Sequence, residues 1–463
     1  MKTILSSFLL FAAFISTPTP SLLADTLSKS KGNRVSAQLT QKIETGENVR
    51  VFIMFDVPKL QTISNKSSSP MSTRLSHQMN AISAVRTNVI AGLSTENFTL
   101  ERQFNYINGM AMTVNADGLS ELLANISVLR VDIDQGGQGH LNEGRPIATI
   151  DAVQSMGYTG EDVVVAVVDS GFDSDHPDLS DDLVAEACFC SDGGAGCCPS
   201  GGTTQFGTGA AEDDHGHGTH VSGIITSSGI VGPIGSAPDA GIVAVKVLDS
   251  ANSFCCASDV TAGLDWVIGR DDVDLVNMSL GTFAGYTGDC DDVFAFTMAM
   301  STAINTLSRK GVVAFASAGN NGSGTEMGAP ACLDKVVSVG AIYDAGVDVG
   351  KVTTFSQSNS ETDVFAPGSL ITSSQLGGGT IDFQGTSMAS PMTAGCAALL
   401  LDIDKSLSAA DIKKALTGSS TQVTDPTNDL NFPLLDCADA VKKAETACYV
   451  IQASNNKVAN VCL

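Results

Sequence analysis

The sequence predicts an α/β protein in which a mostly parallel sheet carries helices on both faces, preceded by a small α+β unit. After residue 146, four near-continuous apolar runs are bounded by turn residues, a pattern typical of strands that are buried on both faces. Helix-like stretches lie between these runs, and strand and helix in alternation predict a parallel sheet. With 463 residues, the chain is long enough for two or three folded units.

The apolar runs locate the expected elements of the larger unit. The predicted strands are "DVVVAVVDSG" (162–171), "AGIVAVKVLD" (240–249), "DLVNMSL" (274–280) and "GVVAFASAGN" (311–320). The predicted helices include "ASDVTAGLDWVIG" (257–269) and "TMAMSTAINTLSRKG" (297–311). Chemistry in such sheets gathers at the carboxyl ends of the strands, so the residues that follow each run are candidates for function.

The first 146 residues alternate strand and helix patterns on a smaller scale. Strands are predicted at 49–55, 106–114 and 130–134, and helices at 79–93 and 117–129. This order favours a small α+β unit. The segment "DQGGQGHLNEGRP" (134–146) then interrupts all periodicity with four glycines and a proline, which predicts an exposed linker.

Residues 1–24 have the pattern of an export signal. Lys2 precedes an apolar run of about a dozen residues, and a small residue ends the segment before Asp25. The run is too short to span a bilayer, and no later segment reaches 18 consecutive apolar residues. We therefore expect a secreted protein without membrane partners, located outside the cell or in an oxidising compartment such as a periplasm.

All 12 cysteines lie at or after position 188. An even number in an exported chain predicts disulfides, although the sequence leaves their pairing open. The cluster "CFCSDGGAGCCP" (188–199) is an alternative metal site, but Cys-x-Cys is not a usual zinc spacing. Cys396 lies in an apolar helical run, where a buried free thiol is the alternative to a disulfide. Cys448 and Cys462 are expected to tether a short C-terminal tail.

Charge is distributed unevenly along the chain. Residues 1–146 carry a net charge of +2 and the remaining residues carry −27, which together give the net charge of −25 for the chain. The acidic part will repel nucleic acid and anionic membranes, so neither is expected as a partner. The excess of acid also serves solubility, which is the simplest explanation for it.

Three polar residues at the ends of these elements suggest nucleophilic catalysis. Asp169 ends the first buried strand, Asn320 ends the fourth, and Ser387 lies at the start of an apolar helical stretch. Each alone is typical of a turn or a helix cap. A serine nucleophile, however, needs an imidazole base and a carboxylate that orients it, and a histidine near 217 completes this set. An Asn side chain and a helix-start N–H can stabilise the oxyanion.

Five segments in order carry a family resemblance: "VAVVDSGFDSDHPDL", "HGTHVSG", "VNMSLG", "SAGN" and "GTSMASP". They resemble the signature segments of the subtilisin-like serine peptidases and extend over about 162–400. The resemblance implies that Asp169 orients the base, that His217 is the general base, that Ser387 is the nucleophile and that Asn320 donates to the oxyanion. No cofactor is implied for catalysis. The first unit looks like the family's inhibitory propeptide, which implies a small α+β unit of the ferredoxin-like type.

The resemblance also implies a place for the substrate. Ser279, Leu280 and Gly281 would pair with an extended peptide by strand addition. Gly319 and Gly328 would shape the main specificity pocket, which is expected to be roomy and apolar, although Glu326 lies nearby. The segment "SANSFCCASD" (250–259) departs from the family pattern, and the Cys-rich insertion before His217 is expected to be a stapled surface loop.

The stretch "AEDDHGHGTHVSGII" (211–225) holds three of the six histidines, so a zinc site is an alternative to a catalytic role. A zinc site is disfavoured because glycines stand where a His-Glu-x-x-His helix would begin. We expect His220 to be packed and hydrogen-bonded and His215 to be an exposed loop residue. A structural calcium ion is left open, because Asp178 matches a ligand of some relatives but its partner loop lacks the expected Asn.

These inferences combine into one organisation: a signal (1–24), an inhibitory propeptide (25–141), a catalytic domain (142–445) and a disulfide-tethered tail (446–463). We expect a monomeric, self-processing zymogen that cleaves itself within 135–147, hydrolyses proteins or peptides and is inhibited by its own propeptide. One alternative is a binding protein that kept the fold and lost turnover, but no catalytic position is substituted. A lipase-like hydrolase would need Gly-x-Ser-x-Gly, whereas Ala389 follows Ser387 at the position of the second glycine.

Overall fold

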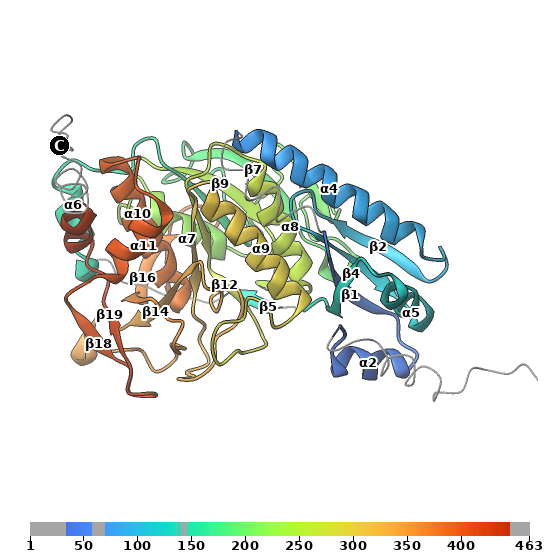
Figure 1. Ribbon diagram of the computed structural model, residues 1–463. Coiled ribbons are helices and arrows are strands. Elements are labelled where there is room, and N and C mark those ends of the chain that lie inside the picture. Colours follow the sequence, from blue (N-terminus) through green and yellow to red (C-terminus); the bar gives the residue numbers. More distant parts are fainter. Residues whose placement is uncertain (1–33, 58–69, 136, 140–145, 445–463) are drawn as a thin grey trace, which may run out of the picture.

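The computed structural model describes residues 34–57, 70–135, 137–139 and 146–444 (Figure 1). The predicted signal at 1–24 and the predicted tail at 446–463, with Cys448 and Cys462, lie outside the described residues. The described part forms an α/β unit with a largely parallel sheet and a smaller α+β unit beside it, which confirms the predicted fold class.

The central sheet has eight strands, and seven of them are parallel. In sheet order the strands are β15 (Val364–Pro367), β14 (Val336–Ile342), β13 (Val313–Ser317), β11 (Leu275–Met278), β6 (Val164–Asp169), β9 (Gly241–Lys246), β7 (Leu183–Phe189) and β8 (Thr204–Phe206). Strand β8 pairs antiparallel with β7 and forms one edge. The four predicted apolar runs are β6, β9, β11 and β13.

Alternate residues of each strand enter two separate cores, as the period of two requires. Val165 and Val167 of β6 pack with α7 (His217–Thr226) and α10 (Thr386–Ile403). Ala166 and Val168 pack with α8 (Ala257–Ile268) and α9 (Ala295–Arg309) on the opposite face. Because both faces are covered, the strands read as continuous apolar runs in the sequence.

The strand order reverses beside β6. From β6 the chain continues to β7 and β9 on one side, and then crosses to β11, β13, β14 and β15 on the other. Ligands of open α/β sheets bind beyond the carboxyl ends of the strands at such a reversal. Asp169 is the last residue of β6 and therefore lies at this point.

The N-terminal unit is an antiparallel sheet of four strands with helices. Its order is β2 (Phe98–Gln103), β3 (Gly109–Val114), β1 (Val49–Phe55) and β4 (Val128–Ile133), with helices α2 (Ala37–Glu44), α4 (Met71–Ala91) and α5 (Ala116–Ala124). The chain order β1, α4, β2, β3, α5, β4 is the ferredoxin-like arrangement. Sequence patterning missed β2 and α2, because "FTLERQ" and "AQLTQKIE" are short and polar.

This unit docks against α8 and α9 of the larger unit (Figure 1). Phe52 and Phe104 are fully buried with ring centroids 5.3 Å apart, and both join the core formed by α8 and α9. The predicted exposed linker is wrong for its described part: Asp134 is 6% exposed, and β5 (Gly137–Gly139) is a strand. The periodicity of the sequence could not reveal this, because Asp134 and β5 both contact residues that are distant in sequence.

Short elements complete the described part. They are β10 (Ser253–Phe254), β12 (Leu280–Thr282), β16 (Ser369–Ser374), β17 (Thr380–Gln384), β18 (Gln422–Thr424), β19 (Asn431–Pro433), α6 (Ile150–Gln154), α11 (Ala409–Thr417), η1 (Pro146–Ala148), η2 (Asp192–Gly194) and η3 (Gly346–Asp348). None of the helices in the described ranges is both long and apolar enough to cross a membrane.

The ten cysteines within the described residues form five disulfides. The pairs are Cys188–Cys198, Cys190–Cys197, Cys255–Cys256, Cys290–Cys332 and Cys396–Cys437. The free-thiol alternative for Cys396 is therefore wrong, because this side chain of α10 is bonded to Cys437. The Cys-rich cluster at 188–198 is held by two disulfides, which confirms the stapled loop and excludes its thiols as metal ligands.

Candidate active site

A buried carboxylate and a buried imidazole meet at the end of β6. His217 Nδ1 lies 2.5 Å from Asp169 Oδ1, and both side chains are almost inaccessible to solvent. Asp169 Oδ1 also accepts the N–H of Ser170 at 2.7 Å. A carboxylate on Nδ1 fixes the tautomer that leaves Nε2 to accept a proton, and it stabilises the imidazolium once the proton has arrived.

The position of His217 is set by the start of α7. Asp213 accepts N–H groups from Gly216 and Thr219 at 3.0 Å and the Thr219 hydroxyl at 2.6 Å, so it caps the helix. Burial alone would raise the pKa of Asp213, but these hydrogen bonds hold it below its ordinary value. A Cβ at Gly218 would lie 2.1 Å from the carbonyl oxygen of Gly171, so only glycine allows α7 to approach β6 this closely.

Ser387 is the second residue of α10, which packs against α7. Gly385 precedes the helix at φ 154°, a conformation that glycine adopts without strain. Pro391 has no N–H to donate to the Ser387 carbonyl one turn earlier. The Ser279 hydroxyl donates to that carbonyl instead, at 2.7 Å, while the Ser387 hydroxyl donates to the Ser279 carbonyl at 3.1 Å.

The amide of Asn320 is oriented by Thr386. Asn320 Oδ1 accepts the Thr386 N–H at 2.9 Å and the Thr386 hydroxyl at 3.0 Å. Because its oxygen is engaged by these donors, the NH₂ group faces the other way and is available to a developing negative charge. The N–H of Ser387 lies in the first turn of α10, where helical N–H groups have no partner within the helix.

A strand of the N-terminal unit occupies the groove beside these residues. Strand β5 pairs antiparallel with β12 on one side and with β10 on the other, and Gly139 lies opposite Leu280, Gln138 opposite Gly281. From Gly137 to Gly139 the partner in β12 moves from Thr282 to Leu280. The chain therefore advances along β12 toward Ser279, whose carbonyl accepts from Ser387.

The two predicted pocket glycines are required for reasons of close packing. A Cβ at Gly319 would lie 2.2 Å from Gln357 Oε1, and a Cβ at Gly328 would lie 2.6 Å from the Thr282 carbonyl oxygen. Glu326 is exposed, and its carbonyl accepts from Gln357 Nε2 at 2.6 Å.

The other two histidines of the motif have separate environments. His220 is fully buried, and its Nε2 lies 3.0 Å from the Ile371 carbonyl, which confirms the packed, hydrogen-bonded role. The prediction that His215 is exposed is wrong: it is half-buried, and its ring centroid lies 6.4 Å from that of His217. Burial, followed by the field of His217, lowers the pKa of His215. The three imidazoles thus face different partners, which does not suit one zinc ion.

Asp178 does not fit the role of a calcium ligand. Its Oδ1 accepts the N–H groups of Ile230 and Val231 at 2.6 and 2.8 Å, and its Oδ2 accepts that of Gly232 at 2.8 Å. Three backbone donors thus occupy the carboxylate that a cation would need. Within the described residues, no group of three or more His, Cys, Asp or Glu side chains could hold a metal ion.

Sequence reasoning missed the residues that orient the predicted ones. Thr386, Asp213 and Pro391 lie inside the quoted motifs, so their positions were visible, but their partners come from distant segments. Asn277 is a further case: it accepts from Ser390 at 2.7 Å and donates to the Ser279 hydroxyl at 3.0 Å. The only available signal was a polar residue within an otherwise apolar strand.

A parallel sheet with an Asp–His pair at its reversal point and a serine at the start of a neighbouring helix defines a serine hydrolase. Residues 160–433 match the sequence model of the Subtilase family. The chain belongs to this family, and it is a serine endopeptidase.

Individual relatives agree with this assignment. Subtilisin E of Bacillus subtilis (strain 168) is 34% identical over 350 residues, which cover 74% of this chain and 83% of the relative. A subtilisin of Bacillus pumilus is 37% identical over 274 residues, or 58% of this chain and 88% of the relative. Alkaline elastase YaB of Bacillus sp. (strain YaB) is 34% identical over 275 residues, or 59% and 63%.

We predict that acid destabilises the protein through His220. Burial lowers the pKa of His220 to about 3, from 6.5. The unfolded chain therefore takes up a proton first as the pH falls below about 6.5, and the free energy of unfolding drops by about 1.4 kcal/mol per pH unit until about pH 3. Urea midpoints of Ser387→Ala, which cannot digest itself, should fall as the pH is lowered from about 7 to about 4. Adding His220→Gln should flatten that slope, and an unchanged slope would refute this origin.

We predict that Asp178 stabilises its loop without calcium. In Asp178→Asn an amide N–H would replace one acceptor oxygen, so at least one backbone donor should lose its partner at a cost of about 1–3 kcal/mol. Thermal unfolding of Ser387→Ala with and without this change, in calcium and in chelator, measures the effect. The loss should be the same in both buffers. Stabilisation by calcium that disappears in Asp178→Asn would instead assign an ion to this carboxylate.

Proposed function

We propose that this endopeptidase is a secreted, self-processing zymogen that cleaves peptide bonds through an acyl-enzyme. Asp169, His217 and Ser387 form its triad, and Asn320 is its oxyanion donor. The observation that carries the proposal is β5, which fills the groove between β10 and β12 and advances toward the serine.

The geometry supports a role for each residue. His217, held by Asp169 on Nδ1, takes the proton of the Ser387 hydroxyl as that oxygen attacks the scissile carbonyl, and later gives it to the leaving amine. The NH₂ of Asn320 and the N–H of Ser387 stabilise the negative oxygen of the tetrahedral intermediate. Water then attacks the acyl-enzyme by the same route, and the peptide acid is released.

Substrates bind as β5 does. Main-chain hydrogen bonds to Leu280, Gly281 and Thr282 hold an extended peptide of any sequence. Gly319 and Gly328 shape the pocket beside it by allowing Gln357 and Thr282 to approach closely. The partners are therefore proteins and peptides, and no cofactor is needed for these steps.

The N-terminal unit acts as an inhibitor in this proposal. Its strand β5 occupies the groove in the manner of a substrate, so no other peptide can enter while the unit remains docked. The net charges of +2 and −27 on the two parts of the sequence favour their association. Cleavage falls within 135–147, and residues 140–145 lie outside the described part.

Secretion follows from the signal pattern at 1–24 and from the five disulfides, which persist in oxidising compartments. We propose that the mature enzyme is a monomer. Removal of the signal and the propeptide takes away most of residues 1–146, the part of the sequence with a net charge of +2.

Ser387→Ala is predicted to abolish both processing and activity. Without the hydroxyl there is no nucleophile for the linker or for an added protein. Expression of both forms side by side, followed by chain mass and casein hydrolysis, measures this. The wild type should split within 135–147 and digest casein, and the variant should remain one chain. If both forms are processed alike and neither digests casein, Ser387 is not the self-cleaving residue and the binding-protein alternative gains support.

Asn320→Ala is predicted to lower kcat by about 10²–10³ with little change in KM, because the lost hydrogen bond forms mainly in the transition state. This range is the one known from removing the corresponding donor of a subtilisin. Steady-state kinetics on a peptide substrate measures it. Thr386→Val, which removes one of the two donors that orient Asn320, should give a smaller loss in the same direction. Equal rises of KM in both variants would indicate a binding role instead.

A further inference from the structure

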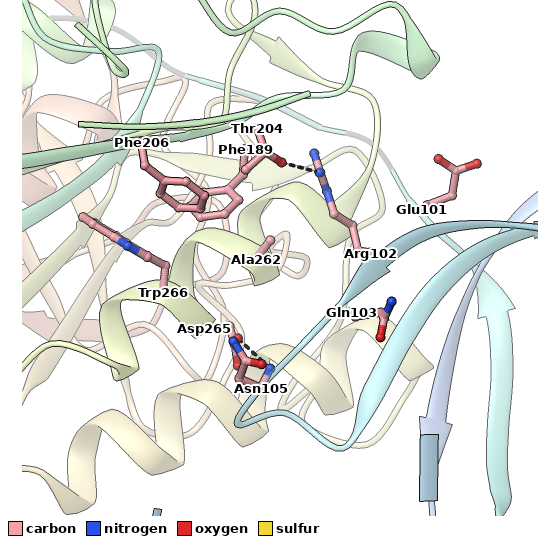
Figure 2. Close-up of a pocket in the computed structure, with 10 residues that line it drawn as sticks. All are labelled: Glu101, Arg102, Gln103, Asn105, Phe189, Thr204, Phe206, Ala262, Asp265 and Trp266. Carbon is pink, nitrogen blue, oxygen red and sulfur yellow. Dashed lines mark hydrogen bonds between the residues drawn. The ribbon is translucent and has the colours of Figure 1, made fainter. Parts of the chain in front are cut away.

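The loop stapled by Cys188–Cys198 and Cys190–Cys197, here called the cystine loop (residues 188–206), contacts the N-terminal unit directly. Arg102 of β2 donates from Nη2 to the Thr203 carbonyl at 2.7 Å and from Nη1 to the Thr204 hydroxyl at 2.8 Å. Figure 2 shows the Arg102 side chain extending from its strand to Thr204 across the gap between the units. A surface insertion thus supplies part of the docking site.

Helix α8 supplies the charge of this site. Arg102 Nε and Nη2 lie 3.0 and 2.8 Å from Asp259 Oδ1, so all three guanidinium nitrogens are hydrogen-bonded. Asp259 is 1% exposed and Arg102 is 9% exposed. Arg50 Nη2 also lies 3.7 Å from Asp259 Oδ1, so the carboxylate faces two guanidinium groups, of which Arg102 makes the hydrogen bonds. Loss of Asp259 would leave the buried Arg102 without its counter-charge.

The acceptors are also held by contacts that do not involve Arg102. Asp259 Oδ2 accepts the N–H and the hydroxyl of Ser191, at 2.9 and 2.6 Å, which ties α8 to the cystine loop and leaves Oδ1 for the guanidinium. Ser191 lies between Cys190 and Cys197, so the disulfides constrain it. The planar fork of an arginine matches this set of acceptors, whereas an ammonium group does not.

A cavity of about 290 Å³ adjoins the guanidinium. Phe189, Phe206 and Trp266 form an aromatic wall, and Asp265 accepts the N–H groups of Asn105 and Tyr106 at 2.8 and 2.7 Å (Figure 2). A charged contact beside two backbone contacts is suited to an extended strand that carries one arginine.

We propose that Asp259, Thr203 and Thr204 form a guanidinium-binding site, built jointly by α8 and the cystine loop, that retains the prosegment through Arg102 after self-cleavage. The inference rests on the proposed zymogen. Once the covalent link is cut, only non-covalent contacts keep β5 in the groove. The cystine loop therefore sets how long the processed enzyme stays inhibited.

The test uses the full precursor and four variants. Arg102→Ala removes the guanidinium, and Arg102→Lys keeps the charge but not the fork. Thr204→Val removes one acceptor with little change of shape, and Gln103→Ala is the control on the neighbouring, exposed residue of the same strand. After processing, the prosegment that co-elutes with the enzyme and the lag before peptide hydrolysis are measured.

Arg102→Ala should release the prosegment at least about 30-fold faster than the wild type, because the buried hydrogen bonds of the guanidinium to Asp259, Thr203 and Thr204 are lost. Arg102→Lys should recover only part of the retention, Thr204→Val should shorten the lag by a few fold, and Gln103→Ala should match the wild type. Arginine amide should shorten the wild-type lag more than lysine amide does, and neither should affect Arg102→Ala.

Wild-type retention in both Arg102→Ala and Thr204→Val would overturn the site while leaving the protease intact. Equal effects of the two amides on the wild type would overturn its guanidinium selectivity. Failure of the wild type to process or hydrolyse peptide would count against the proposed zymogen itself. If Arg102→Ala does not fold, Thr204→Val and the amide competition still decide the question.

Discussion

The buried contact between Asp169 and His217 is the constraint around which the rest of the active site is arranged. Both side chains are buried, and a buried polar group is costly unless it is hydrogen-bonded; Oδ1 of Asp169 accepts from Ser170 and lies 2.5 Å from His217 Nδ1. This requires α7 to begin at the carboxyl end of β6, where no room exists for a Cβ at Gly218. Gly218 of "HGHGTH" is therefore a consequence of the close approach of α7 to the segment that follows β6, whereas Gly216 adopts a positive φ of 98°.

Two helix starts supply the remaining groups. Each first turn has N–H groups without intrahelical partners, and this chain uses them in different ways. At α7, Asp213 accepts the N–H of Thr219 and Ser170 accepts that of Gly218, which fixes the turn that carries His217. At α10, Thr386 uses its N–H to turn the amide of Asn320, while Pro391 leaves a carbonyl that Ser279 binds. Ser387 is thus fixed by Ser279, the residue that precedes β12.

Much of the fold could be predicted from the sequence, because buried parallel strands leave continuous apolar runs at 162–171, 240–249, 274–280 and 311–320. The motif residues were equally visible, since their chemistry requires particular residue types in a fixed order. Contacts between distant segments were not predictable. Nothing near Cys396 indicates Cys437, and the glycines of 137–139 suggest a linker until β10 and β12 are seen on either side. The partners of polar residues could not be predicted for the same reason: the three residues that donate to Asp178 follow it by about 50 positions.

The interface between the two units contains apolar and polar contacts, which have different roles. Phe52 and Phe104 enter the core beside α8 and α9, which gives non-directional attraction. Such packing tolerates small shifts, whereas strand β5 must stay in register with β12. Directional contacts at the periphery, Arg102 on Asp259 and the N–H groups of Asn105 and Tyr106 on Asp265, exclude those shifts. In the proposed zymogen, cutting the chain would remove the high effective concentration of a tethered inhibitor, so these contacts would matter most after self-cleavage.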